Sequence, residues 1–278
     1  MKRKKQEFLF KLLIFIAILI GAILLLIPLA WLVSTSLKPR GQLFLTPPKW
    51  IPNPILWGNY KKALTILPFH IFLKNTLIIT FSVTFGTVLS SSIVAFGFAR
   101  LRAPLRNFFF IVLLSTLMIP FQVVMIPRFI LFKYLNWIDT FAPIIVPNFF
   151  AGAWNVFLLR QFYLTIPLEY DDAARIDGCS SWGIYWRIIL PLAKPALVAI
   201  GVYSIMWQWN DFLEPLIYLN SQRKFTLQLG LRIFQGMHFT DWSLMMAATT
   251  VVLLPCLILF FFTQRYFMKG IVVSGVKG

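Results

Sequence analysis

Several runs of apolar residues in this sequence are too long for a soluble domain to bury. The first follows a basic N-terminal flank and covers residues 11–34, with no charged side chain after Lys11. A helix of about 20 apolar residues crosses the hydrocarbon core of a bilayer. Hydrophobic residues make up 59% of the chain, more than the roughly 45–50% typical of soluble domains. The chain is therefore predicted to be an integral membrane protein.

Six apolar segments predict an all-α fold with six transmembrane helices. The first is expected to be a retained span rather than a cleaved signal peptide, because it continues past Pro28 to Trp31 without a small-residue cleavage site. A segment at about 163–195, between spans four and five, is too charged to cross the membrane. After an N-terminal segment of residues 1–10, the spans are expected at about 11–34, 72–98, 107–127, 141–162, 196–219 and 244–268.

The basic residues indicate the orientation of these spans. An even number of spans places both termini on one side, and 15 of the 26 lysines and arginines fall on that side. The positive-inside rule then predicts cytoplasmic termini and a cytoplasmic segment 163–195. The formal net charge of +17 is explained by side chains that flank the spans and contact anionic lipid. No basic stripe interleaved with aromatic residues suggests a nucleic-acid partner.

Two spans carry signals for packing and bending. Ser82, Gly86 and Ser90 recur every four residues in the second span, a spacing of small side chains that lets another helix approach closely. In the third span, Pro120 predicts a kink, with Gln122 expected to bond the freed backbone.

The segment between spans four and five concentrates acidic residues, since four of the nine in the chain fall within residues 169–177. Acids at the start of a helix interact favourably with its dipole, and Gly178 stands where a left-handed residue would end that helix. Ser180 or Ser181 is expected to cap a second short helix that ends at Pro191. These features predict two short helices joined by a tight bend.

An aromatic ridge is expected beside this bend, because Trp182, Tyr185 and Ile189 are spaced to share one helical face. The residues alone leave two interpretations open. The segment is either a docking element for another protein or an amphipathic loop that rests on the lipid headgroups.

The same segment resembles the EAA loop of ABC importer permeases. The matching residues are the run "DDAARIDG" that ends at Gly178, followed by "IILP", which ends at Pro191. Asp172 replaces the usual Glu, and Cys179 stands where a small residue such as Ala is common. Four further stretches, "LMIPFQVVMIP", "WQWNDFLEPLIYL", "FTLQLGL" and "QRYFMKGIVVSGVKG", resemble the shorter, six-span permease subunit of maltose-type carbohydrate importers.

The resemblance implies that residues 11–278 form an importer transmembrane domain in a bacterial or archaeal cytoplasmic membrane. It also implies a second permease subunit, two ATPase subunits that use ATP and Mg, and an extracellular or periplasmic solute-binding protein. The chain itself would bind no cofactor and catalyse no reaction. The segment 163–195 would dock on an ATPase subunit, with these candidate residues: Glu169, Asp171, Asp172, Ala173, Ala174, Asp177, Gly178, Trp182, Tyr185 and Pro191.

Span five is the most polar segment within the expected membrane region. Ionisable and polar groups there usually face a cavity or a partner, so we expect its polar stripe to line a sugar pathway. The alternative is that Asn210 and Asp211 bond the backbone near Pro215 and hold a bend. The candidate pathway residues are Tyr203, Ser204, Trp207, Gln208, Asn210 and Asp211, with Asn148 and Asn155 as weaker candidates on span four.

Two other classes of function fit less well. In an ion-coupled secondary transporter, Asp211 or Glu214 would serve as the relay, but no acidic residue lies near the expected midplane. A membrane-embedded enzyme would need a catalytic motif such as HExxH or GxSxG, which the sequence lacks. No metal-ligand spacing is present either, and His70 and His238 stand apart in polar connections.

Overall fold

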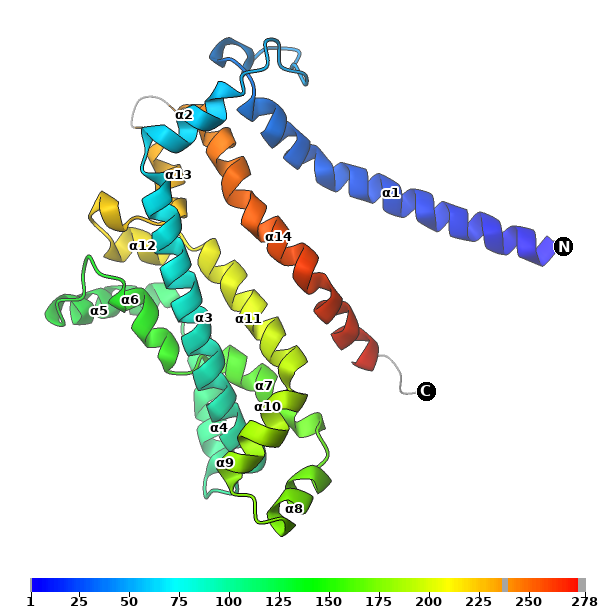
Figure 1. Ribbon diagram of the computed structural model, residues 1–278, viewed down its shortest axis with the longest axis vertical. Helices are drawn as coiled ribbons and strands as arrows, with labels where there is room; N and C mark the ends of the chain where they lie inside the picture. The colour runs from blue at the N-terminus through cyan, green and yellow to red at the C-terminus, as the bar shows by residue number, and fades with distance from the viewer. Residues whose placement is uncertain (1, 237–239, 275–278) are drawn as a thin grey trace. The chain divides into compact units, whose positions relative to one another are not determined.

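The computed structural model describes the backbone of residues 2–236 and 240–274 and the side chains of residues 6–236 and 240–264. Within these residues the regular structure is helical apart from an isolated bridge between Gln235 and Thr240 (Figure 1). The predicted all-α fold is confirmed. The chain divides into two units, described separately below: Met1–Pro68 with Leu231–Leu254, and Phe69–Gly230 with Pro255–Gly278.

The first unit contains α1 (Lys2–Ser36), which extends beyond the expected span at both ends. Its apolar side chains are exposed along most of its length, as expected for a helix whose surroundings are lipid. After α1, only the short turn η1 (Arg40–Gln42) is helical before α2 (Gly58–Ile66). The prolines between Pro39 and Pro54 account for this, because proline cannot donate to a helical hydrogen-bond ladder.

Lys38 lies just after α1 and anchors the start of this connection. Its ammonium lies 3.7 Å from the centroid of the Trp31 ring, and burial lowers its pKa. The Lys38 carbonyl accepts hydrogen bonds from Ser243 Oγ at 3.0 Å and from Asn59 Nδ2 at 3.2 Å. Lys38 therefore ties together three segments of the first unit.

The second unit is built around α3 (Phe69–Arg100), against which α7 (Ala153–Thr165) and α11 (Lys194–Trp209) pack. Its main hydrophobic core includes Phe96 and Leu159. Other elements are α4 (Arg106–Ser115), η2 (Thr116–Met118), α5 (Phe121–Tyr134), α6 (Ala142–Ile145), η3 (Val146–Phe149), α8 (Glu169–Ile176), α9 (Ser181–Ile184), the π-helical turn η4 (Tyr185–Ile189), α10 (Leu190–Leu192), α12 (Leu213–Tyr218) and η5 (Gln222–Lys224). Helices α13 (Leu227–Ile233) and α14 (Trp242–Ser274) contain residues of both units.

The small residues of α3 allow a close approach, as their spacing predicted. A Cβ atom added to Gly86 would lie 2.6 Å from ring carbons of Phe149 in η3. One turn further along α3, Ser90 Oγ accepts a hydrogen bond from the backbone N–H of Ala151 at 3.1 Å and donates to the Gly86 carbonyl at 2.7 Å. Glycine and serine together therefore bring the backbone of residues 149–151 against α3.

The third expected span, 107–127, is broken in the structure. The α4–η2 segment, residues 106–118, and α5 meet at an angle of 96°. Ile119 is extended, with φ −86° and ψ 111°, because the ring of Pro120 disfavours a helical conformation in the residue before it. Residues 128–134, expected to lie between the third and fourth spans, are part of α5.

The fifth expected span, 196–219, also ends early. Helix α11 stops at Trp209, and α12 begins at Leu213. Before α11, residues 181–192 form a helical segment bent by 75° from it. Among the described residues, four helices are long and apolar enough to cross a membrane, and the number rises to six if each bent pair is one span.

Asp139 lies in the turn between α5 and α6 and joins it to the turn between α12 and η5. Its Oδ1 accepts the backbone N–H groups of Asn220 and Ser221 at 2.9 Å each, and its Oδ2 accepts the Ser221 hydroxyl at 2.5 Å. Lys224 Nζ lies 3.3 Å from Asp139 Oδ2. The hydrogen bonds from Ser221 hold the pKa of this carboxyl well below its ordinary value. The carboxylate therefore stabilises both turns at all but strongly acidic pH.

Candidate functional site

The acidic segment forms α8, which projects beyond the end of α3 in Figure 1. Two hydrogen bonds close its C-terminal end as a Schellman turn. The N–H of Gly178 donates to the Arg175 carbonyl at 3.0 Å, and the next N–H, of Cys179, donates to the Ala174 carbonyl at 2.8 Å. Gly178 has a φ of +77°, so the predicted left-handed conformation is confirmed. Glycine adopts this conformation without the strain that a Cβ introduces.

A second short helix follows the turn. The Ser180 hydroxyl accepts the N–H of Gly183 at 3.2 Å, so of the two predicted caps Ser180 is the one used. Pro191 does not end this helix as expected. It lies inside α10, directly after the π-helical turn η4, and the helix ends at Leu192. A π-turn, with its wider hydrogen-bond ring, accommodates a residue that lacks an N–H.

The acidic residues of α8 divide between its two faces. Asp171 is buried, 2% exposed, whereas Glu169, Asp172 and Asp177 are exposed. Asp171 Oδ2 lies 3.8 Å from Nε of Arg100, the last residue of α3. Burial raises the pKa of the Asp171 carboxyl above its ordinary value, and the nearby charge of Arg100 opposes that shift. Asp171 therefore faces the helical bundle and is not available to a partner protein.

The expected aromatic ridge is mostly buried. Tyr185 and Ile189 are fully buried in the main core of the second unit, and the Tyr185 hydroxyl lies 2.6 Å from Ser92 Oγ of α3. Trp182 is 57% exposed. The prediction that Tyr185 contributes to a docking surface is wrong, because its ring fills the space between η4 and α3.

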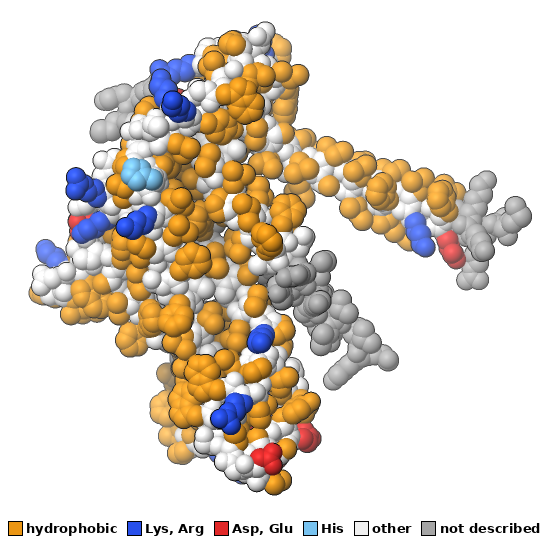
Figure 2. Space-filling view, in the orientation of Figure 1, with side chains coloured by type: hydrophobic (Ala, Val, Ile, Leu, Met, Phe, Trp, Pro, Cys, Tyr) orange, Lys and Arg blue, Asp and Glu red, His pale blue; other side chains and the backbone are white. Residues whose placement is uncertain are grey.

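The residues that remain exposed define a candidate docking surface, the outer face of α8. It combines carboxylates with apolar side chains, and Ile176 at the end of the helix is 86% exposed. The space-filling view shows carboxylates gathered over α8 (Figure 2). A groove of about 450 Å³ runs beside them, lined partly by Ala174 and Ile188. The outer face consists of Glu169, Tyr170, Asp172, Ala173, Arg175, Ile176 and Asp177, with Arg175 Nη1 3.6 Å from Asp172 Oδ1.

The polar stripe on α11 divides in a similar way. Ser204 and Gln208 are buried, and Ser204 Oγ accepts a hydrogen bond from Thr84 of α3 at 3.2 Å. Tyr203 and Trp207 lie on the adjacent, exposed face, with ring centroids 6.1 Å apart and planes inclined by 30°. This aromatic pair is therefore the exposed part of the stripe in this chain.

Asn210 and Asp211 bond the backbone. Asn210 Nδ2 donates to the Met206 carbonyl at 2.8 Å, and Asp211 Oδ1 accepts the N–H groups of Leu213 at 3.1 Å and Glu214 at 3.4 Å. These bonds end α11 and cap α12. They match the alternative in which the two residues hold a bend.

The weaker candidates on the fourth span differ from each other. Asn148 Nδ2 donates to the Ile144 carbonyl at 2.7 Å, and its Oδ1 lies 3.5 Å from Thr87 Oγ1 of α3. The buried Oδ1 of Asn155 has no hydrogen-bond partner among the described residues. Asn148 therefore serves packing, whereas Asn155 keeps an unused acceptor.

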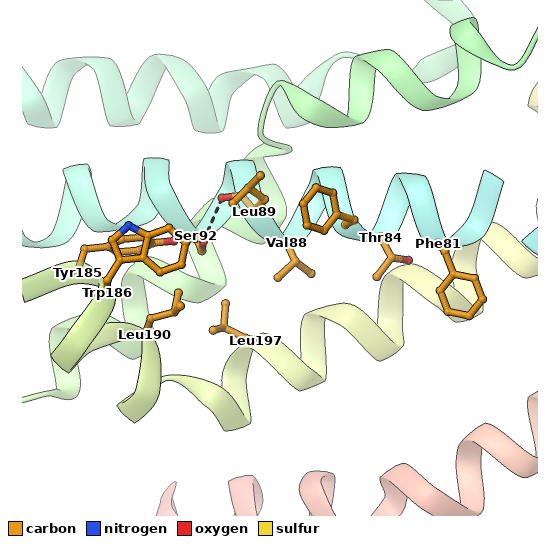
Figure 3. A pocket seen from close by; sticks show the side chains of 10 residues that line it. Phe81, Thr84, Val88, Leu89, Ser92, Tyr185, Trp186, Leu190 and Leu197 are labelled. Carbon is orange, nitrogen blue, oxygen red and sulfur yellow. Dashed lines mark hydrogen bonds between the residues drawn. The ribbon is translucent and has the colours of Figure 1, made fainter. Parts of the chain in front are cut away.

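An open groove that the sequence did not reveal lies along α3 (Figure 3). Its volume is about 460 Å³, and its walls are largely apolar. Residues 81–92 meet residues 185–190 and Leu197 here, so the groove exists only once three distant segments pack together. It is lined by Phe81, Thr84, Phe85, Val88, Leu89, Ser92, Tyr185, Trp186, Leu190 and Leu197.

Comparison with known proteins places these features in context. Residues 87–273 match the family described as "Binding-protein-dependent transport system inner membrane component". The arabinooligosaccharides transport system permease protein AraQ of Halalkalibacterium halodurans is 35% identical over 260 residues, covering 92% of this chain and 93% of that protein. The sn-glycerol-3-phosphate transport system permease protein UgpE of Yersinia pestis is 33% identical over 267 residues, with coverage of 93% and 95%.

Solved structures are similar in fold. The crystal structure of a bacterial ABC transporter involved in the import of the acidic polysaccharide alginate matches with a TM-score of 0.81 and 22% identity, covering 93% of this chain and 96% of that chain. A crystal structure of a bacterial alginate ABC transporter in complex with an alginate pentasaccharide-bound periplasmic protein matches with a TM-score of 0.70 and 15% identity, covering 95% of each chain.

Proposed function

The chain belongs to the family of binding-protein-dependent transport system inner membrane components, and from this premise we propose that it is one of two permease subunits in an ABC importer for a sugar or oligosaccharide. The relatives named above carry, by their names, arabinooligosaccharides and sn-glycerol-3-phosphate. The observation that carries the proposal is the outer face of α8, an exposed surface of mixed acidic and apolar residues fixed to the end of α3.

The complex works by alternating access. Two ATPase subunits bind ATP and Mg, and this chain binds neither. Their closure moves α8, which docks on one of them through its outer face. A solute-binding protein delivers the sugar from the other side of a bacterial or archaeal cytoplasmic membrane. Both termini of this chain and the segment 163–195 lie in the cytoplasm, in agreement with the excess of basic residues on that side.

The aromatic pair on α11 contacts the solute. Sugar rings present apolar faces that pack against aromatic side chains, and the exposed rings of Tyr203 and Trp207 offer such a surface. The groove along α3, by contrast, has walls too apolar for a sugar.

Both relay candidates of an ion-coupled mechanism have partners within this chain. Asp211, one relay candidate, is engaged by two backbone N–H groups. Glu214, the other, lies 3.4 Å from Arg128 Nη1. A relay carboxylate must bind and release a proton or ion during transport, and these partners hold both carboxylates in place.

The proposal is tested by purifying the tagged chain in mild detergent from its native membrane and reconstituting the purified complex in proteoliposomes. We expect one second permease and a pair of ATPase subunits to co-purify. Sugar uptake should require ATP with the ATPase subunits and persist when ionophores collapse the ion gradients. Recovery of the chain alone, with uptake that stops on addition of an ionophore, would instead support a secondary transporter.

Gly178 provides a test of the docking loop. Replacing Gly178 with valine is expected to lower uptake several-fold while leaving membrane insertion normal, because a β-branched residue at this positive φ is strained by roughly 1–2 kcal/mol. No atom lies within 4 Å of a Cβ added there, so the effect arises from the backbone rather than from a clash. Gly178→Asn is the matched control, since asparagine tolerates the left-handed conformation. If both variants take up solute at the wild-type rate, the left-handed turn at Gly178 has no role in uptake.

Trp207 provides a test of the solute pathway. Replacing Trp207 with alanine is expected to raise the apparent KM of uptake up to about 10-fold, because loss of an aromatic stacking contact of about 0.5–1.5 kcal/mol weakens solute binding. Trp207→Phe keeps an aromatic face and should stay within about two-fold of wild type. If the alanine variant transports with unchanged KM and kcat, the solute does not contact this face of α11.

A further inference from the structure

Arg100 is a buried arginine at the point where α3 ends. Its side chain is 1% exposed, and that of Asp171 is 3% exposed. Arg100 Nη2 donates to the carbonyl of Tyr163 at 2.7 Å and to that of Ile166 at 2.6 Å. Its Nε faces Asp171 Oδ2 at 3.8 Å. A single guanidinium therefore contacts the end of α7, the residue after it and the inner face of α8.

The partners of Arg100 belong to segments that are far apart in the sequence. Tyr163 lies in the last turn of α7, and Ile166 is the residue that ends that helix. The carbonyls at a helix C-terminus lack partners within the helix and carry a partial negative charge. Arg100 Nη2 satisfies two of these carbonyls. Its charge lies beside the Asp171 carboxylate as an ion pair without a hydrogen bond, since Arg100 Nε and Asp171 Oδ1 have no hydrogen-bond partner among the described residues.

We propose that Arg100 is the positioning residue through which movement of α8 reaches the transmembrane helices. The inference rests on the proposed function, since it assumes that α8 receives the movement of an ATPase subunit. A buried charge cannot separate from its partner without a large desolvation penalty. Arg100 and Asp171 therefore move together, and α3 and the end of α7 move with them.

The contacts along α3 show which other helices a movement of its end would displace. Ser92, two turns before Arg100, contacts the Tyr185 hydroxyl of η4 at 2.6 Å. Thr84, further along the same helix, bonds Ser204 of α11 at 3.2 Å. A displacement of the end of α3 thus acts directly on α11, the helix that carries the aromatic pair. Arg100 occupies the end of this series of contacts nearest α8.

The pair could instead serve only the stability of the fold, and the two roles predict different measurements. A purely structural role would reduce the amount of assembled importer, and uptake and ATP hydrolysis would fall in proportion. A positioning role separates the two activities, because the ATPase subunits still dock on the outer face of α8 and hydrolyse ATP. The number of solute molecules imported per ATP is therefore the discriminating quantity.

The experiment uses the complete importer in proteoliposomes, with variants Asp171→Asn and Arg100→Gln and the control Arg102→Gln. Arg102 is an exposed arginine two residues along the chain with no ion-pair partner among the described residues. We expect Asp171→Asn to assemble with its ATPase subunits and to hydrolyse ATP at no less than about half the wild-type rate. Import per ATP should fall at least about five-fold, a factor that corresponds to about 1 kcal/mol of coupling. The control should match wild type.

Two outcomes would overturn the inference. One is import per ATP that is unchanged in Asp171→Asn. The other is a loss of uptake fully accounted for by a loss of assembled complex. Arg100→Gln removes all three contacts and should uncouple more strongly, and if this variant fails to assemble, Asp171→Asn decides. Failure of the proposed function is distinguishable, because the wild-type complex would then show no ATP-dependent import at all.

Discussion

Replacing Ile176 with lysine is expected to lower ATP-driven uptake about 100-fold while the chain still inserts in the membrane at wild-type level. Ile176 is 86% exposed at the last position of α8, so the substitution disturbs little within this chain. Exposed substitutions usually change stability by no more than about 0.5 kcal/mol, and a cation is favoured at a helix C-terminus. The effect must therefore arise where α8 meets its partner.

The expected size follows from burial of this side chain on docking. Complete burial of an isoleucine contributes about 1.5–3 kcal/mol, and an unpaired ammonium in the same place adds a desolvation penalty. A total of about 3 kcal/mol corresponds to roughly two factors of ten in the docking equilibrium. The measurement is the dissociation constant between the detergent-solubilised permease pair and the ATPase subunit, followed by uptake of the reconstituted complex.

Ile176→Met is the matched control for this experiment, because it conserves volume and apolar character and such swaps usually cost less than about 1.5 kcal/mol. We expect it to bind the ATPase subunit and transport nearly as wild type does. If Ile176→Lys also binds with unchanged affinity, the end of α8 lies outside the docking interface, and the surface would have to be sought around Trp182.

The structure of the segment 163–195 was predictable from sequence where local chemistry decides it. Gly178 ends α8 because glycine adopts a positive φ without the strain that a Cβ introduces, and Ser180 caps the next helix because its hydroxyl accepts a backbone N–H. The division of the acids was not predictable. Asp171 and Asp172 are neighbours of the same chemical type, but Asp171 shares the inward face of α8 with Ala174 and lies beside Arg100.

For the aromatic ridge and the polar stripe, too, the sequence did not predict which side chains are buried in this chain. Helical spacing placed Tyr185 and Ile189 on one face, but spacing cannot say whether that face meets a partner or the core of this chain. On α11, Ser204 and Gln208 are buried and the aromatic pair is exposed. The inward face is the one that packs on α3, where Thr84 bonds Ser204 and an added Cβ on Gly201 would make an ordinary contact of 3.8 Å with a Val88 methyl. Such contacts join residues more than 100 positions apart.

For the broken third span, the sequence identified the cause of the bend but not the bend angle. Pro120 predicted a kink, and the helices on its two sides meet at 96°. A proline removes a hydrogen bond and excludes the helical conformation at the preceding residue. The final angle depends on what packs against α5, which continues past Pro127 and Arg128 to Tyr134 although the span was expected to end at residue 127.

Replacing Gly86 with leucine is expected to destabilise the second unit by about 2–3 kcal/mol and to abolish assembly with the other permease. A Cβ alone would lie 2.6 Å from two carbons of the Phe149 ring and 2.9 Å from its Cγ, so the whole ring must move rather than its tip. Overpacking of this kind costs about 1–3 kcal/mol in a well-packed core. The hydrogen bond from the Ala151 N–H to Ser90 Oγ would be stretched as residues 149–151 move away from α3.

A rescue experiment separates this steric cause from any general effect of a larger residue in a membrane helix. Gly86→Ala should lower the melting temperature of the detergent-solubilised protein. Combining Gly86→Ala with Phe149→Ala should recover part of this loss in melting temperature, because removal of the ring makes room for the new methyl group. Phe149→Ala alone supplies the remaining corner of the double-mutant cycle. Residues that compete for one space give a non-additive cycle, with a coupling of about 1 kcal/mol or more. An additive cycle would mean that the ring of Phe149 adapts freely, and the close approach of residues 149–151 to α3 would then depend on Ser90 rather than on the glycine.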